Sequence, residues 1–134
     1  MSRSVVFYGK PTCINNRKQV RLLVQAGVDV AQRDIFEEQW SVAMLSRFFN
    51  GVPLLDCVNP SAPLLKSKEL DVETLSRFAL LQMMCLNPVL IRRPLIVYED
   101  SHWVGFNWEQ LCTDLELNFI EPTGNNIETC AKER

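Results

Sequence analysis

This 134-residue sequence lacks the patterns that mark a metal site, a membrane span or a secretory signal. Its single histidine has no cysteine partner at metal-ligand spacing, and its five cysteines, at positions 13, 57, 85, 112 and 130, include no C-x-x-C pair. No apolar run approaches the about 20 residues that cross a bilayer, and the run at 5–8 is too short for a signal peptide. We therefore expect no zinc site, no membrane segment and a cytoplasmic location.

An excess of charge of either sign is also missing, because the formal net charge is −2. This balance provides no basic surface for nucleic acid or for an anionic membrane. The odd number of widely spaced cysteines argues against a secreted disulfide framework, so we interpret them as reduced thiols in a reducing compartment. Residues 1–120 are expected to form one domain. The polar tail at 121–134 has little periodicity and is expected to be poorly ordered.

The residues that are present open with a strand, a helix and a second strand. Residues 4–8 are mostly β-branched or aromatic, and residues 14–26 place apolar side chains at helical spacing before Gly27. Residues 28–33 alternate apolar and polar side chains, as a half-buried strand does. Such a β-α-β unit is normally a right-handed crossover between parallel strands, and its functional end is the first strand-to-helix turn.

The rest of the chain predicts helices, then a hairpin and a last helix. A helix is expected at 41–49, irregular structure or short helical turns at the proline-rich residues 54–68, and a helix from an Asp71 N-cap to residue 86. This last helix would bury a face formed by Leu75, Phe78, Ala79, Met83 and Leu86. Residues 95–98 and 102–106 predict an antiparallel hairpin, followed by a helix at 107–117 that turns its apolar side chains towards the sheet, namely Trp108, Leu111 and Leu115. The fold class is therefore α/β.

Cys13 is the residue that most favours a chemical function. It stands between the first strand and the first helix, where unpaired backbone N–H groups and the helix dipole favour thiolate over thiol. Lys10 precedes it in the loop and Arg17 follows one turn later, so both could lower the thiol pKa. The alternatives are a small buried hydrophobic side chain for Cys13 and solvated surface charges for Lys10 and Arg17.

A second pattern is Arg93-Pro94, directly ahead of the buried strand at 95–98. A proline at this position can present the preceding backbone in a turn beside another loop, and a cis peptide is possible there. The alternative for Arg92 and Arg93 is a pair of charges that flanks the hairpin.

Together these motifs, residues 8–13 with Arg17 and residues 90–97, resemble the ArsC arsenate reductase and Spx family. The resemblance covers about residues 4–117 and implies a thioredoxin-like mixed sheet with a helical insertion, in the order β-α-β, helices, β-β-α. Residues 13–16, 59–66 and 91–94 with 104–106 are most similar to the nitrogenase-associated, ArsC-related proteins of that family.

The resemblance implies roles for individual residues. Cys13 would be the nucleophile, helped by Arg17, and Arg93 would be one of three arginines that hold an oxyanion. Lys10, Asn16 and the presumed cis proline Pro94 would contact the substrate. Glutathione and glutaredoxin would complete the reduction, with no metal and no resident cofactor.

The sequence departs from the family pattern at two points, and the first concerns the arginines that would bind arsenate. No arginine occurs at 54–63, where Asn59 and Pro60 stand, or at 101–107, where Gly105 and Phe106 stand. Because charge-assisted bonds are roughly twice as strong as neutral ones, the loss of two arginines should weaken arsenate binding.

The second departure is Asn16, which replaces the second cysteine of an Spx-type C-x-x-C pair. A disulfide within the motif is therefore impossible. A monothiol cycle through glutathione remains, as does a disulfide to another cysteine. Cys57 is the first candidate for that resolving thiol, and a buried or plainly exposed thiol is its alternative role.

Two functions follow. The first is an ArsC-like thiol oxidoreductase that works with glutathione or glutaredoxin. The second is a non-catalytic binding or regulatory protein, in the way that Spx proteins bind RNA polymerase. By resemblance, the context of either would be nitrogenase maturation or protection, with nitrogenase-related proteins as partners.

Overall fold

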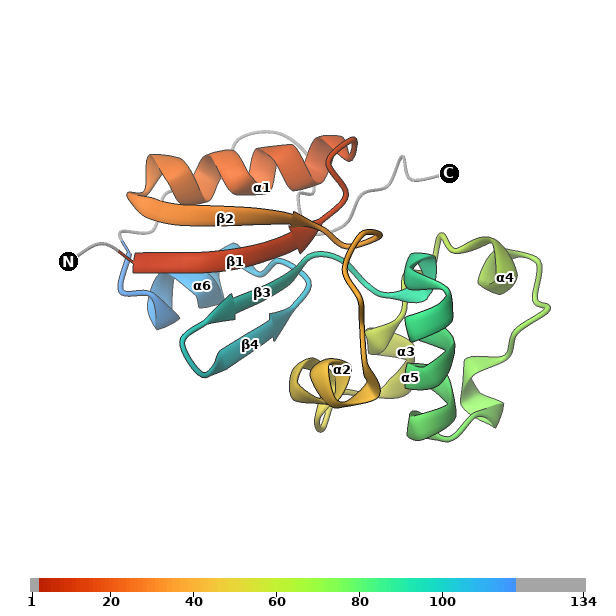
Figure 1. Cartoon of the computed structure of the whole chain (residues 1–134). Coiled ribbons are helices and arrows are strands. Elements are labelled where there is room, and N and C mark those ends of the chain that lie inside the picture. The colour runs from red at the N-terminus through yellow and green to blue at the C-terminus, as the bar shows by residue number, and fades with distance from the viewer. Residues whose placement is uncertain (1–2, 118–134) are drawn as a thin grey trace.

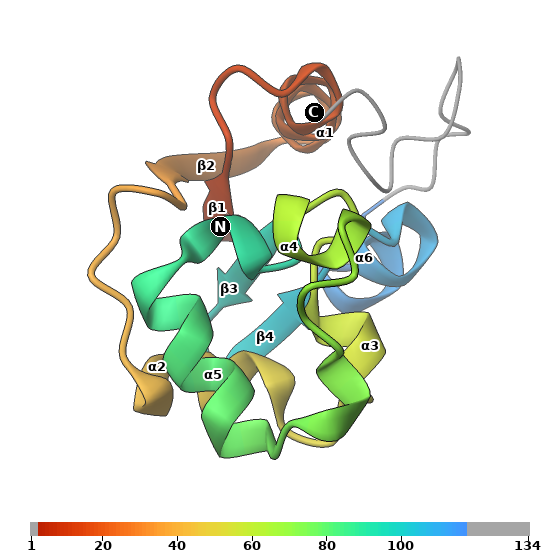
Figure 2. The ribbon, with the colours of Figure 1, turned by 90° about the vertical axis from the view of Figure 1, so that its right-hand side faces the viewer.

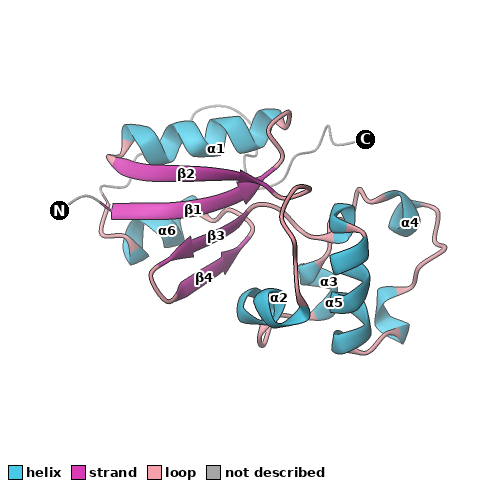
Figure 3. Ribbon diagram, in the orientation of Figure 1, coloured by secondary structure: helices cyan, strands magenta, loops and turns pink. Residues whose placement is uncertain are grey.

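The computed structural model describes residues 3–117, in which a β-α-β unit is followed by a helical insertion, a hairpin and a last helix (Figure 3). The elements are β1 (Arg3–Gly9), α1 (Ile14–Gln25), β2 (Val28–Asp34), α2 (Val42–Phe49), α3 (Leu54–Cys57), α4 (Pro63–Lys66), η1 (Val72–Thr74), α5 (Arg77–Leu86), η2 (Pro88–Leu90), β3 (Leu95–Tyr98), β4 (Ser101–Val104) and α6 (Trp108–Asp114). The strands form one four-stranded mixed sheet in the order β2-β1-β3-β4. The predicted α/β class and element order are confirmed.

Strands β1 and β2 are parallel and in register from Arg3 opposite Val28 to Gly9 opposite Asp34. Their carboxyl ends therefore lie at the same edge of the sheet. There the Ile35 backbone N–H donates to the Gly9 carbonyl at 2.9 Å. This pairing brings the segment after β2 beside the loop that leads into α1.

The two faces of the sheet pack against different helices. Phe7 of β1 is paired with Ile96 of antiparallel β3, and both belong to the core that α1 and α6 cover. The next pair along, Tyr8 with Leu95, faces the other way and packs on the core of the helical insertion, as the alternation of side chains along a strand requires. Figures 1 and 2 show α2 to α5 gathered beyond the end of the sheet to which β1 points.

The helix predicted from Asp71 begins later than expected. The Asp71 carboxylate accepts from the Glu73 N–H and caps the short 3₁₀ turn η1, while the Ser76 hydroxyl caps α5. Because the chain is extended at Leu75 between these turns, the buried face of α5 differs from the predicted one. Phe78 and Leu86 are exposed, and the residues of α5 that are buried are Leu80, Leu81 and Met84.

The end of the described chain matches the prediction. Helix α6 buries Trp108 and Leu111 in the core that α1 also covers, and Leu115, directly after the helix, is buried there as well. The expected disorder of the tail at 121–134 concerns residues outside those that the structure describes. Within residues 3–117, no helix is long and apolar enough to cross a bilayer.

Candidate functional site

The turn between β1 and α1 is held by backbone hydrogen bonds at both ends. The Cys13 N–H donates to the Lys10 carbonyl at 2.9 Å, and the Arg17 N–H donates to the Cys13 carbonyl at 3.1 Å as the first bond of α1. Ser, Thr, Asp or Asn usually provides the side chain that caps a helix of this kind. Here the capping residue is a cysteine.

Cys13 is the N-cap of α1, with extended backbone angles, so the first helical residue is Ile14. The Asn16 backbone N–H points at the Cys13 sulfur, with 3.5 Å between N and Sγ. This places Sγ where the unpaired N–H groups and the positive end of the helix dipole lie. Cys13 is buried, and its sulfur is in the disulfide form in this structure, so the expectation that all the cysteines are reduced thiols is wrong for Cys13.

Cys57, proposed from the sequence as the first candidate resolving thiol, is not disulfide-bonded, and neither is Cys85 or Cys112. The side chain of Cys57 is fully buried, and its Sγ lies 3.3 Å from the Pro53 carbonyl oxygen. Burial raises the pKa of the Cys57 thiol, although the Arg77 guanidinium beside it opposes the shift. A buried, protonated thiol is a poor nucleophile, so Cys57 does not fit the resolving role. The fifth cysteine, Cys130, lies outside the described residues.

Asn16 is largely buried in the turn between β1 and α1. Its side chain is 4% exposed, Oδ1 accepts from the Lys10 N–H at 2.8 Å, and Nδ2 donates to Gln19 Oε1 at 2.9 Å. Gln19 is itself fully buried. Both ends of the Asn16 amide are thus committed to the protein.

Arg93 and Pro94 are joined by a cis peptide bond, as the sequence pattern allowed. Arg93 is 5% exposed, and its Cζ lies 5.8 Å from the centre of the Phe36 ring. Phe36 follows β2 and was not predicted from the sequence to belong to the site. The parallel pairing of β1 and β2 is the signal that could have found it, since it brings the residues after both strands to one edge.

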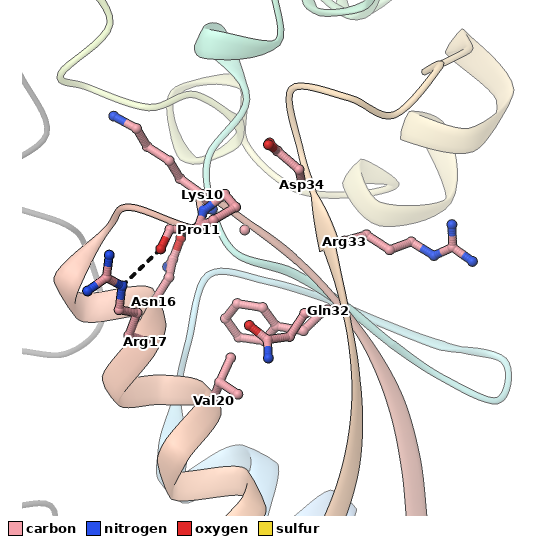
Figure 4. Close-up of a pocket in the computed structure, with 10 residues that line it drawn as sticks. Lys10, Pro11, Asn16, Arg17, Val20, Gln32, Arg33 and Asp34 are labelled. Atoms are coloured by element: carbon pink, nitrogen blue, oxygen red, sulfur yellow. Dashed lines mark hydrogen bonds between the residues drawn. The ribbon is translucent and has the colours of Figure 1, made fainter.

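A cavity of about 80 Å³ lies beside the loop (Figure 4). It brings together three of the predicted site residues, Lys10, Asn16 and Arg17, whereas the other three, Cys13, Arg93 and Pro94, do not line it. Arg17 is fixed by a 2.9 Å hydrogen bond from Nε to the Pro11 carbonyl. In Figure 4 the Lys10 and Arg33 side chains extend in opposite directions, away from Gln32 in the middle of the view. The cations therefore surround the cavity without converging on one point in it.

Asn59, which stands where the family pattern has an arginine, has a structural role. It is 8% exposed, its Nδ2 donates to the Val89 carbonyl at 3.3 Å, and its Oδ1 accepts from the Ser61 N–H at 3.0 Å. These bonds connect the proline-rich segment to the chain ahead of β3, so the amide is used within the fold.

Gly105, at the other expected arginine position, has φ +76°, a value that favours glycine. A Cβ there would lie 3.0 Å from Nε and Nη2 of Arg92. Arg92 therefore fills the space next to Gly105, and its Nη1 donates to the Asp56 carbonyl at 3.3 Å. Neither Asn59 nor Gly105 therefore provides a cation.

The mixed sheet, the cysteine at the start of α1 and the cis proline before β3 define a thioredoxin-like α/β protein. Residues 8–113 match the ArsC family, and the chain belongs to that family. The resemblance inferred from the motifs is thereby confirmed.

The similar proteins include regulators, reductases and a protein without an assigned function. The chain is 32% identical over 129 residues to an uncharacterised 15.7 kDa protein of the draG 3′ region of Rhodospirillum rubrum, covering 96% of this chain and 89% of that protein. It is 29% identical over 119 residues to the global transcriptional regulator Spx of Streptococcus pyogenes serotype M1, covering 86% and 87%. The solved arsenate reductase from Vibrio cholerae has a TM-score of 0.71 and 27% identity, covering 88% of this chain and 100% of its own.

Proposed function

We propose that this protein is a monothiol oxidoreductase that uses glutathione and in which Cys13 is the nucleophile. The observation that carries the proposal is the position of Cys13 as the N-cap of α1, with the Asn16 N–H 3.5 Å from Sγ. Helix N–H groups aimed at a sulfur stabilise the thiolate, which is the reacting form. Arg93, buried beside the cis proline, is proposed as a second source of positive charge at this end of the sheet.

The proposed cycle exchanges thiols and disulfides. The reduced Cys13 thiolate attacks the glutathione sulfur of a mixed disulfide R–S–S–G, the S–S bond breaks, and the leaving thiolate takes a proton from water. The thiolate of a second glutathione then attacks the Cys13 mixed disulfide, which regenerates Cys13 and releases oxidised glutathione. The substrate disulfide is reduced and two glutathione sulfurs are joined, so atoms and electrons balance. A glutaredoxin thiol could replace the second glutathione.

The test is turnover of the mixed disulfide between glutathione and 2-mercaptoethanol by the reduced full chain. We expect Cys13→Ser to abolish turnover, because a hydroxyl is not ionised near neutral pH and does not attack a disulfide. Cys85→Ser is the matched control, since Cys85 is a free thiol on α5, and it should keep the activity of the parent. Retained turnover in Cys13→Ser would rule out the proposal.

A second candidate function is suggested by the similarity to Spx regulators. In this alternative the fold is kept for binding a protein such as RNA polymerase, and no thiol chemistry is needed. The relative from the draG region is the similarity that favours the expected nitrogenase-related context. That context is compatible with both candidate functions. A deletion strain separates the two. Complementation by Cys13→Ser would favour binding, and failure of that variant alone, at an unchanged protein level, would favour chemistry.

A further inference from the structure

We propose that Asn16 is a positioning residue that sets the reactivity of Cys13 by holding the turn between β1 and α1. The inference rests on the proposed function, in which Cys13 is the reacting thiol. Its basis is that Asn16 contacts this turn at two points, through its backbone N–H at Cys13 Sγ and through its side-chain oxygen at the Lys10 N–H. One residue therefore joins the entry and the exit of the turn.

The contacts form a chain from the helix interior to the sulfur. Gln19, fully buried one turn further along α1, accepts from Asn16 Nδ2 and so fixes the orientation of the amide. The amide oxygen accepts from the Lys10 N–H, and the Lys10 carbonyl accepts from the Cys13 N–H. A displacement of Lys10 is thus transmitted directly to the backbone of Cys13.

Removal of the Asn16 amide would take a hydrogen-bond partner from Lys10 N and from Gln19 Oε1 at the same time. A buried polar group that loses a hydrogen bond carries a desolvation penalty. The turn can lower this penalty by opening to water, and that motion would carry Sγ away from the α1 N–H groups. The thiolate would then lose stabilisation, which is an effect on reactivity and not only on folding.

Gly9 provides the space that this arrangement needs. A Cβ at Gly9 would lie 2.9 Å from Asn16 Oδ1 and 2.7 Å from Phe7 Cε1, both closer than such contacts normally come. An added methyl group would therefore push against the oxygen of the Asn16 amide as well as against the Phe7 ring. Gly9 and Asn16 should act on Cys13 as one unit, and their substitutions should not add.

The experiment measures the rate of alkylation of Cys13 by iodoacetamide between pH 5 and 10, in the reduced full chain, for Asn16→Ala, Gly9→Ala and the double variant. We expect a midpoint about one pH unit higher in each single variant, so that alkylation is about tenfold slower at pH values well below the midpoint, as for a thiol pKa raised by one unit. The double variant should shift the midpoint by less than the sum of the two single shifts. If Asn16→Ala does not fold, Gly9→Ala alone must show the shift.

The matched control is Leu23→Ala, a fully buried apolar residue on the same helix. It should lower the unfolding temperature and leave the alkylation midpoint unchanged, which separates positioning from general destabilisation. An unchanged midpoint in the folded Asn16→Ala and Gly9→Ala variants, or additive effects in the double variant, would overturn the inference. A higher KM with unchanged kcat and midpoint in Asn16→Ala would also overturn it, because Asn16 would then contact the substrate in the cavity that it lines.

Alkylation does not require turnover, so this result is independent of the proposed function. A shifted midpoint in a protein that does not exchange disulfides would keep the role of Asn16 and refute the oxidoreductase. Normal disulfide exchange with an unshifted midpoint would refute the role of Asn16 and keep the oxidoreductase proposal.

Discussion

At the scale of single residues, Phe36 and Arg93 make a contact that exists only in the folded chain. The ring follows β2 and the guanidinium precedes Pro94, yet Cζ lies 5.8 Å from the ring centre. The face of an aromatic ring attracts a cation, by about 0.5–1 kcal/mol at an exposed site and by about 2 kcal/mol for a desolvated cation, and Arg93 is buried. The ring also covers part of Arg93, which is one of the proposed sources of charge at the site.

We therefore expect Phe36→Ala to slow disulfide exchange and to lower the free energy of unfolding only by the amount that the ring contact contributes. The ring contact should account for a loss of stability of up to about 2 kcal/mol, while Arg93 becomes more hydrated and acts less strongly on the thiol. Exchange kinetics and urea unfolding of the same preparation provide the measurement. Phe78→Ala, which removes an exposed ring from α5, is the control and should leave exchange unchanged. Equal effects of the two variants on exchange would contradict the prediction.

Cys57 gives a prediction for the dependence of stability on pH. Burial raises the pKa of its thiol in the folded protein above the ordinary value. The folded state therefore holds the proton more tightly than the unfolded state. The resulting stabilisation is complete below the pKa of the unfolded state and is lost as the pH rises through the higher folded value.

We accordingly expect the free energy of unfolding of the reduced protein to fall as the pH rises above about 8.5, the ordinary pKa of a cysteine thiol. The fall should be smaller in Cys57→Ala, which lacks the buried thiol at position 57 and keeps the other thiols, among them Cys85, whose pKa is also raised by burial. Urea unfolding at several pH values with reductant present measures both curves. Parallel curves for the parent and the variant would show that Cys57 does not contribute. Tyr8, whose pKa is also raised, chiefly by burial, adds to the fall in both proteins at still higher pH.

At the scale of elements, the position of the helix caps decides which face of α5 is buried. Ser76 Oγ accepts from the Ala79 N–H at 3.1 Å at the start of the ten-residue helix α5. Asp71 caps only the three-residue turn η1. Both residues are good N-caps by type, so composition alone does not identify the one that starts the long helix.

Ser76→Ala should lower the free energy of unfolding by about 1 kcal/mol, the usual value for the loss of an N-cap. Asp71→Ala should cost less, since fewer backbone groups depend on it. Ser46→Ala, in the middle of α2 and exposed, is the control and should be close to neutral. Denaturant unfolding of the three variants tests this ranking, and a larger loss in Asp71→Ala would refute it.

The other elements were predicted closely because local patterns decide them. The β-branched and aromatic residues of β1, the helical spacing of α1 and the stop at Gly27, with φ +88°, are all properties of neighbouring residues. The break at Leu75 is different. It depends on how η1 packs beside α3, which no local pattern records.

At the scale of the whole molecule, the ArsC fold is kept while two positions of the expected arginine site serve the scaffold. Asn59 connects the proline-rich segment to Val89, and Gly105 leaves room for the Arg92 guanidinium. Of the three positions at which the resemblance implies an arginine, one holds an arginine in this sequence, namely Arg93. A single guanidinium binds an oxyanion much more weakly than three do.

We therefore expect no arsenate reduction above background when the protein is supplied with glutathione and glutaredoxin. The assay follows NADPH oxidation through glutathione reductase, with the glutathione mixed disulfide as the positive control for an active preparation. Arsenate turnover that depends on Cys13 would contradict the prediction and would restore the reductase function.

The sequence by itself determined the class of fold, the place of Cys13 between the first strand and the first helix, and the Arg93-Pro94 motif ahead of the third strand. These follow from residues that are neighbours in the chain, and backbone propensity and hydrophobic periodicity act at that range. Only the tertiary structure decided that Phe36 covers Arg93 and that Arg92 occupies the space beside Gly105. It also decided that Asn16 is buried as part of the turn and that the Cys57 thiol is buried away from solvent. Each of these depends on side chains that meet through packing, and parallel strands and a helical insertion bring them together without leaving a local pattern in the sequence.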